Sequence, residues 1–117
     1  MLFRSLELYT VLPELPETEL RNMYSQLQRA GTSIVLNIVE GCSNRSNKVF
    51  LNHLQYSYGS AKEVDVLLQL CYDLNYIDKE VFLALSRVLE ELKAALYRFM
   101  QSVDKEIVLS KPNFSYT

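Results

Sequence analysis

Glycine and proline are scarce in this chain, whose 117 residues contain three of each. Because these residues punctuate turns, their scarcity leaves little room for loops. The chain has no long polar tract, so disorder is expected only at its ends. No apolar run approaches the roughly 20 residues of a membrane span, and the first residues lack the basic and apolar regions of a signal peptide. These absences favour a cytoplasmic protein with no membrane contact.

Residues that carry metal or redox chemistry are also few. The two cysteines, Cys42 and Cys71, lie far apart and form no CxxC motif, which suits a reducing compartment. Zinc takes about four nitrogen or sulfur ligands, and His53 is the only histidine. The Glu-x-x-His pairs of a di-iron bundle are absent, and Arg45 lies too far from His53 for a helical ribonuclease. We therefore expect no metal, no cofactor and no catalytic residue.

Helical periodicity runs through most of the chain. The hydrophobic fraction is 49% and the charged fraction 22%, as in ordinary globular proteins. Apolar side chains recur at steps of three and four residues, and no stretch alternates with the period of a strand. Gly41 is predicted to end the second helix in a left-handed conformation, and Asp78 to cap the fourth. The predicted helices cover residues 2–12, 16–41, 46–74 and 79–107.

Four helices joined by short links predict an all-α, antiparallel up-down four-helix bundle with a shortened first helix. Residues 1–108 form its single domain, and residues 109–117 a flexible C-terminal tail. The short first helix leaves one corner of the bundle half covered. The segment 33–39 is apolar almost all the way round and needs cover on every side. Both features predict that the chain partners itself as a homo-oligomer.

Charge is distributed unevenly along the chain. The formal net charge is −2, but the stretch 21–62 holds five basic residues and one acidic residue, which hints at a basic face. The alternative is that these charged side chains merely lie on solvent-exposed helix faces. The candidate nucleic-acid-binding residues are Arg21, Arg29, Arg45, Lys48 and Lys62.

Polar and small residues interrupt the apolar pattern at a few positions. Asn37 and Glu40 lie three residues apart on one helix face. They either receive a partner group or, as we favour, are structural: Asn37 sets helix register, and Glu40 pairs with Arg29 or Arg45. A mid-helix glycine costs about 1 kcal/mol relative to alanine, so we expect Gly59 to permit close approach of another helix. The candidate structural motif comprises Asn37, Glu40, Gly41, Gly59, Ser60 and Glu63.

These positions belong to a longer pattern. The chain resembles the four helix bundle protein family, whose first members were encoded by intervening sequences in bacterial large-subunit ribosomal RNA genes. The resemblance covers about residues 13–100, and this chain departs from the pattern at Gln28, Val39 and Asn75. The matching residues are Gln26, Arg29, Ala30, Ser33, Ile34, Asn37, Ile38, Glu40, Gly41, Arg45, Gly59, Ser60, Glu63, Tyr76 and Ile77.

The resemblance implies a four-helix protomer and a ring-shaped homopentamer. It also points to a related protein, the accessory variability determinant of diversity-generating retroelements, which binds a reverse transcriptase and nucleic acid. The expected function is therefore a non-enzymatic, homo-oligomeric module that binds RNA or a ribonucleoprotein such as a retroelement reverse transcriptase. The alternative is an oligomeric scaffold with protein partners only.

Overall fold

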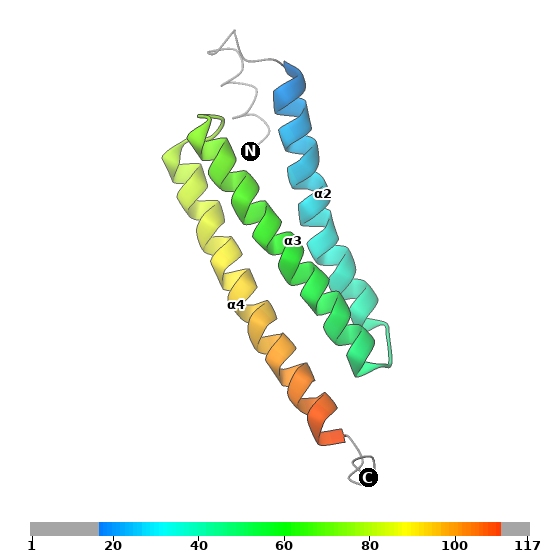
Figure 1. Ribbon diagram of the computed structural model, residues 1–117. Helices are drawn as coiled ribbons and strands as arrows, with labels where there is room; N and C mark the ends of the chain where they lie inside the picture. Colours follow the sequence, from blue (N-terminus) through cyan, green and yellow to red (C-terminus); the bar gives the residue numbers. More distant parts are fainter. Residues whose placement is uncertain (1–16, 111–117) are drawn as a thin grey trace.

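The computed structural model describes residues 17–110, which form three helices. Helix α2 spans Glu17–Cys42, α3 spans Asn47–Asp73 and α4 spans Lys79–Ser110. Successive helices run antiparallel, and α2 and α4 both pack against α3 (Figure 1). No strand occurs between residues 17 and 110, so the all-α class is confirmed. The four-helix bundle is not established, because the predicted first helix, residues 2–12, lies outside the described residues.

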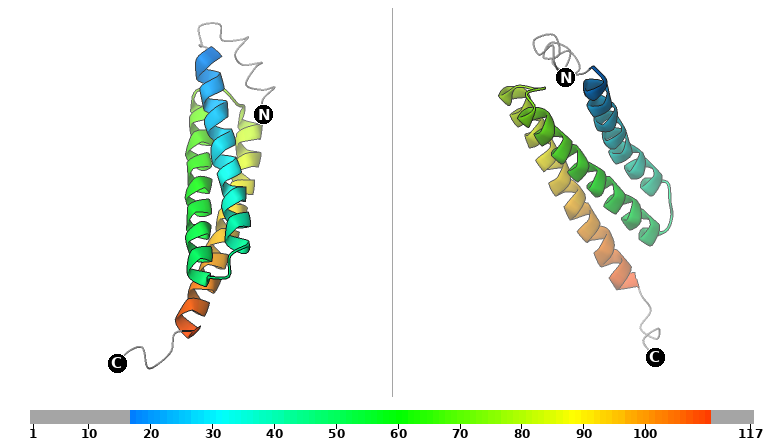
Figure 2. Two further views of the ribbon diagram at one scale, coloured as in Figure 1. Left: turned by 90° about the vertical axis from the view of Figure 1, so that its right-hand side faces the viewer. Right: turned by 45° about the horizontal axis from the view of Figure 1, so that its top comes forward.

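Two apolar clusters follow one another along the bundle. The first draws buried side chains from all three helices, including Ile34, Leu68 and Leu89. Seen from its own side, α2 lies in front of both α3 and α4 (Figure 2, left). The second is built on Leu54 and Leu96 at the other end. Their spacing at steps of three and four residues directs one stripe of each helix inward. The buried stripes of α3 face both neighbours, which makes α3 the central helix.

The turn between α3 and α4 is fixed by capping. Asn75 has φ 63°, and the Tyr76 N–H donates to the Cys71 carbonyl at 2.7 Å while the Asn75 N–H donates to that of Tyr72 at 3.0 Å. This is a Schellman motif, in which asparagine is the usual substitute for glycine. The predicted cap at Asp78 is confirmed, since its Oδ1 accepts the Val81 N–H at 2.9 Å.

The left-handed conformation predicted at Gly41 is wrong. No glycine of the chain has a positive φ, and α2 continues through Gly41 to Cys42. A Cβ at this position would lie 2.8 Å from Phe50 Cδ1 and 3.0 Å from the His53 Cβ. Glycine is therefore required by the close approach of α3. That helix begins after Ser46, whose hydroxyl accepts the Val49 N–H at 3.4 Å.

The last helix is longer than its periodicity indicated. α4 continues to Ser110, two residues into the segment assigned to the tail, and extends past the link between α2 and α3 (Figure 1). Residues 111–117 lie outside the described part of the chain. Among the described residues, no helix has the length and apolar character needed to cross a membrane.

Candidate functional site

A ladder of hydrogen-bonded polar side chains crosses the contact between α2 and α3. The Ser60 hydroxyl donates to Ser33 Oγ at 2.9 Å. Asn37 Nδ2 donates to the carbonyl and hydroxyl oxygens of Ser33 at 2.9 and 3.1 Å, and Asn37 Oδ1 lies 3.1 Å from His53 Nδ1. Together with Ser57, these residues form the polar seam. The structural interpretation of Asn37 fits this geometry, because its amide ties one level of α2 to one level of α3.

Small side chains bring the two helices together beneath the seam. Ser57 and Ala61 are completely buried, and the Ser57 hydroxyl donates to the Ile34 carbonyl at 2.9 Å. A buried hydroxyl with a partner avoids the cost of an unsatisfied polar group. Gly59 does not take part. It is exposed with no described atom within 4 Å of its Cβ position, so the predicted close approach at Gly59 does not occur among the helices that the structure describes.

Two open grooves border the polar seam on one side. The smaller, of about 300 Å³, lies between α2 and α3, and the larger, of about 550 Å³, lies along α2. They share Arg29 and Ser33. Their linings bring together four residues of the predicted structural motif: Asn37, Glu40, Ser60 and Glu63. The fold therefore gathers these motif residues on one rim of the α2–α3 contact.

The predicted ion pair of Glu40 is wrong. Within residues 17–110, the Glu40 carboxylate forms no ion pair with either Arg29 or Arg45, and it is exposed. Arg29 lies eleven residues earlier, about 16 Å along the helix, so the two charges occupy opposite ends of the larger groove. The Glu40 carbonyl accepts the Ser43 hydroxyl at 2.9 Å.

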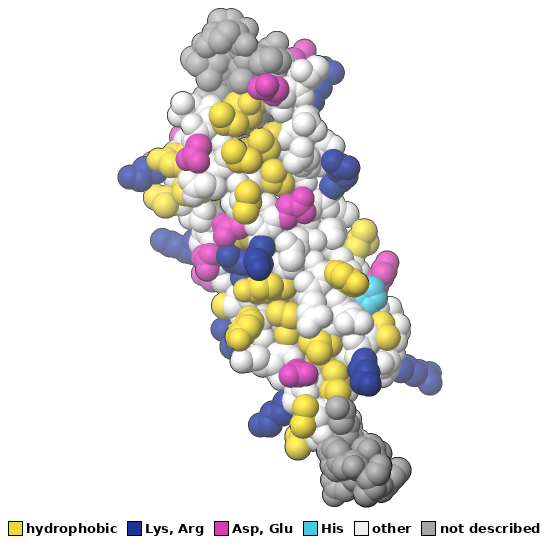
Figure 3. Space-filling view, in the orientation of Figure 1, with side chains coloured by type: hydrophobic (Ala, Val, Ile, Leu, Met, Phe, Trp, Pro, Cys, Tyr) yellow, Lys and Arg dark blue, Asp and Glu magenta, His cyan; other side chains and the backbone are white. Residues whose placement is uncertain are grey.

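The five basic candidates do not form one patch. Arg21 is paired with Glu17 in the first turns of α2, and Lys62 lies over the Tyr58 ring, 5.7 Å from its centroid. Arg29 lines both grooves. On the face in Figure 3, lysine and arginine side chains project at separate points, mainly along the edges.

Two of the basic candidates do lie together, at one end of the bundle. Arg45 is in the link between α2 and α3, and Lys48 is in the first turn of α3. Both are exposed, and that turn contains no acidic residue. The unpaired N–H groups of a helix N-terminus add positive potential at the same place. This pair, which we call the basic end, combines fixed charge with a helix terminus that suits anions.

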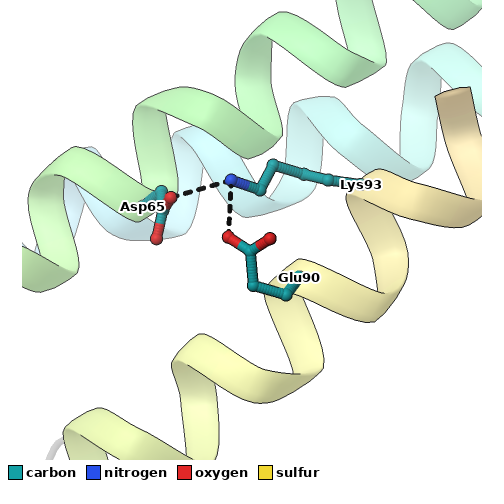
Figure 4. A network of polar contacts seen from close by, with 3 residues as sticks. All are labelled: Asp65, Glu90 and Lys93. Carbon is teal, nitrogen blue, oxygen red and sulfur yellow. Dashed lines mark hydrogen bonds and ion pairs between the residues drawn. The ribbon is translucent and has the colours of Figure 1, made fainter.

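An ion-pair network that periodicity missed joins α3 to α4. The Lys93 Nζ lies 2.9 Å from Asp65 Oδ2 and 2.9 Å from Glu90 Oε1 (Figure 4). The hydrogen bond to Asp65 and that to Glu90 raise the pKa of Lys93 from 10.5 to about 12. The sequence signal for this network was Asp65, an acidic residue on α3. Only the fold shows that Asp65 lies beside Lys93 of α4.

The remaining chemistry-bearing residues are dispersed. Cys42 is exposed and Cys71 is buried, and neither forms a disulfide. Burial raises the pKa of the Cys71 thiol from 9.0 to about 11, which keeps it protonated. Between residues 17 and 110, no three metal-ligating side chains converge. His53 contacts Asn37 and the Tyr56 ring.

Taken together, the antiparallel helices, the polar seam and the grooves define a small all-α helical-bundle protein whose candidate site lies on the α2–α3 rim. Residues 4–98 match the family described as 23S rRNA-intervening sequence protein. The match spans most of the 117 residues, and the chain belongs to this family. No curated protein matches the chain.

Proposed function

We propose that the chain is a non-enzymatic, homo-oligomeric module that binds RNA or a ribonucleoprotein in the cytoplasm. The observation that carries the nucleic-acid part is the basic end, where Arg45 and Lys48 lie exposed beside the N-terminus of α3. The first turn of α3 contains no acidic residue, and the neighbouring Glu106 carboxylate of α4 accepts a hydrogen bond from Asn47 Nδ2 at 3.4 Å. Phosphate contacts dominate the affinity of proteins for nucleic acid. One protomer offers few such contacts, so the proposal requires several copies.

Self-association is supported by apolar side chains that no described residue covers. Val35, Leu36 and Val39 of α2 are 59%, 53% and 57% exposed. Contiguous apolar surface of this kind marks interaction sites. Membership of the family, together with the resemblance described above, favours five copies in a ring. Light scattering coupled to size-exclusion chromatography would give the mass, and a mass equal to one chain at all concentrations would contradict self-association.

A four-helix protomer is the further part of this proposal. The apolar positions Leu2, Leu6, Tyr9 and Leu12 repeat at helical spacing, and a helix there would cover part of the bundle. Deleting residues 1–12 should then lower the melting temperature and expose apolar surface to a fluorescent dye. An unchanged melting temperature would contradict the proposal of a fourth helix.

Charge reversal at the basic end tests RNA binding directly. The double variant R45E/K48E should lose at least tenfold in affinity for a structured RNA at low salt, since each cation contributes to phosphate neutralisation. The matched control is R87E/R98E, which reverses two exposed charges on α4. Equal affinity of the two variants would contradict the assignment of the basic end.

The second candidate function is a scaffold that binds only proteins. Exposed apolar side chains on α4 favour it, among them Val88 at 61% and Tyr97 at 52%. The two functions separate cleanly, because a scaffold would bind no RNA at low salt. A ribonucleoprotein partner such as a retroelement reverse transcriptase would suit both the basic end and the exposed apolar side chains of α4, since it offers phosphate and protein surfaces. In either case we propose no catalytic role for His53, whose Nδ1 is engaged by Asn37.

A further inference from the structure

Two charges on the α2 rim have no partner in the described part of the chain. Arg29 and Glu40 stand at opposite ends of the larger groove, are exposed, and form no ion pair there. Thr32 and Leu36 lie between them. The steps of three, four and four residues place all four side chains on one helix face, and the eleven residues rise about 16 Å. We call this face the α2 stripe.

A face of matching length, which also runs from a basic to an acidic residue along the chain, lies on α3. Lys62, Val66, Gln69 and Asp73 follow one another at steps of four, three and four residues, and all four are exposed. The rise is again about 16 Å, with Val66 62% exposed between the two charges. We call this face the α3 stripe. Because α2 packs on α3 through the polar seam, the two stripes of one protomer cannot meet.

We propose that the α2 stripe of one copy docks antiparallel on the α3 stripe of the next copy. In this arrangement Arg29 faces Asp73, Glu40 faces Lys62, and the exposed Leu36 packs against Val66. Opposite charges set the register of such contacts and exclude the parallel orientation, which would oppose like charges. The inference rests on the proposed self-association and adds to it the surfaces that meet.

Chain segments outside the described residues are poorer occupants of the α2 stripe. Residues 1–16 join α2 at Glu17, about 28 Å from Leu36 and about 34 Å from Glu40. A helix over residues 2–12, about 16 Å long, would reach Leu36 only with residues 13–16 fully extended and would fall short of Glu40. The segment 111–117 contains no acidic side chain to pair with Arg29. A second copy supplies both missing charges.

The contact has a consequence for symmetry. Because each copy uses two different faces, the contact is heterologous, and repeated contacts of this kind close into a ring when the rotation allows. An isologous pairing would instead stop at two copies. The small groove beside the α2 stripe, with Glu63 on its wall, would then lie at the edge of each contact.

Charge swapping in the full chain tests the pairing. R29E and D73R should each raise the dissociation constant of the assembly about tenfold or more, because each places like charges together. The double variant R29E/D73R should restore the wild-type mass. The matched control is R87E/D104R, which reverses two exposed charges on α4. Circular dichroism melts would check that each variant is folded.

Mixing the two single variants sharpens the test. In a mixture, the α2 stripe of an R29E chain fits the α3 stripe of a D73R chain through the swapped charges, and the reverse contact keeps the wild-type pair. The two variants should therefore assemble together by alternating, although neither assembles alone. Assembly that ignores both reversals, or a double variant that stays dissociated, would overturn the docking of these stripes while leaving self-association intact. A monomeric wild-type chain would overturn both proposals.

Discussion

The two contacts that α3 makes are unlike each other. Toward α4 it presents large apolar and aromatic groups, such as Phe50, whose ring meets that of Phe99 edge to face at 5.3 Å. The charges there are paired, as Lys93 and Asp65 show. Toward α2 it presents serines, an alanine and His53, and Arg29 and Glu40 at that rim form no ion pair with any residue between 17 and 110. The Lys93 network pairs charges across the α3–α4 contact, although the buried Ser86 hydroxyl of α4 has no hydrogen-bond partner within residues 17–110. The α2–α3 rim leaves charged groups available to another molecule.

Removing core volume from the α3–α4 side should have the largest effect. Leu54 is completely buried between Leu96 and Val103, so Leu54→Ala is expected to lower the free energy of unfolding by about 2–5 kcal/mol. Leu83→Ala is the control, since Leu83 is 53% exposed. Urea titrations would measure both, and a loss below about 1 kcal/mol at Leu54 would mean that this cluster does not hold the bundle together.

Adding one methyl group distinguishes two glycines whose surroundings in the structure differ from those predicted from the sequence. Gly41→Ala should destabilise the protein by about 1–3 kcal/mol, because the new Cβ would press on the Phe50 ring. Gly59→Ala should stabilise it by about 1 kcal/mol, because that helical position is open and alanine is the better helix former. Thermal melts would show the two shifts, and shifts of the same sign would contradict the close approach of α3 at Gly41.

The Lys93 network should contribute less and only over part of the pH range. Lys93→Met is expected to cost about 1 kcal/mol near neutral pH, since both carboxylates are partly exposed. The pKa of Lys93 is raised in the folded state from 10.5 to about 12. The stabilisation is therefore fully present below pH 10.5 and is lost as pH rises through 12.

The difference in unfolding free energy between wild type and Lys93→Met, measured against pH, reports this loss. Groups that titrate in both proteins, such as Cys71 and Tyr76, cancel in the difference. A gap between the two proteins that widens above pH 10.5 would contradict the ion-pair assignment.

The thiols should distinguish the rim from the core without altering the fold. Exposed Cys42 is expected to react with an aromatic disulfide reagent within minutes at pH 8. Buried Cys71, whose pKa is raised to about 11, should react only in denaturant. Counting released thiolate before and after unfolding would check this, and two reactive thiols in the native protein would show that the contact of Cys71 with its neighbours opens readily.

The sequence predicted the helices and caps because those features are local. Periodicity located all three described helices. Asp78 was predicted as a cap because aspartate is a preferred N-cap residue and stands at the start of a helical pattern. The errors fell on residues whose role depends on another helix. Gly41 is buried by α3 rather than ending α2, and Gly59 has no described atom within 4 Å of its Cβ position. The ion pair between Lys93 and Asp65 escaped prediction for the same reason, because no local pattern encodes it.

The sequence predicted several residues of the candidate site, but it did not predict how they are arranged. Asn37, Ser60 and Glu63 were singled out, and the fold places them on one rim. The expected Glu40 pairing failed because a straight helix keeps residues eleven apart about 16 Å from each other. The five basic candidates were chosen because they lie in one stretch of the sequence, residues 21–62. The fold separates two of them, Arg21 and Lys62, from the basic end.

Binding of a structured RNA at two salt concentrations tests the central claim most directly. We expect tight binding at low salt that weakens steeply as salt rises, with a slope larger than the two cations of one basic end can supply. Such a slope would mean that several copies contact one RNA. No binding at low salt, or an affinity that salt does not change, would contradict the account and leave the α2–α3 rim as a surface for proteins alone.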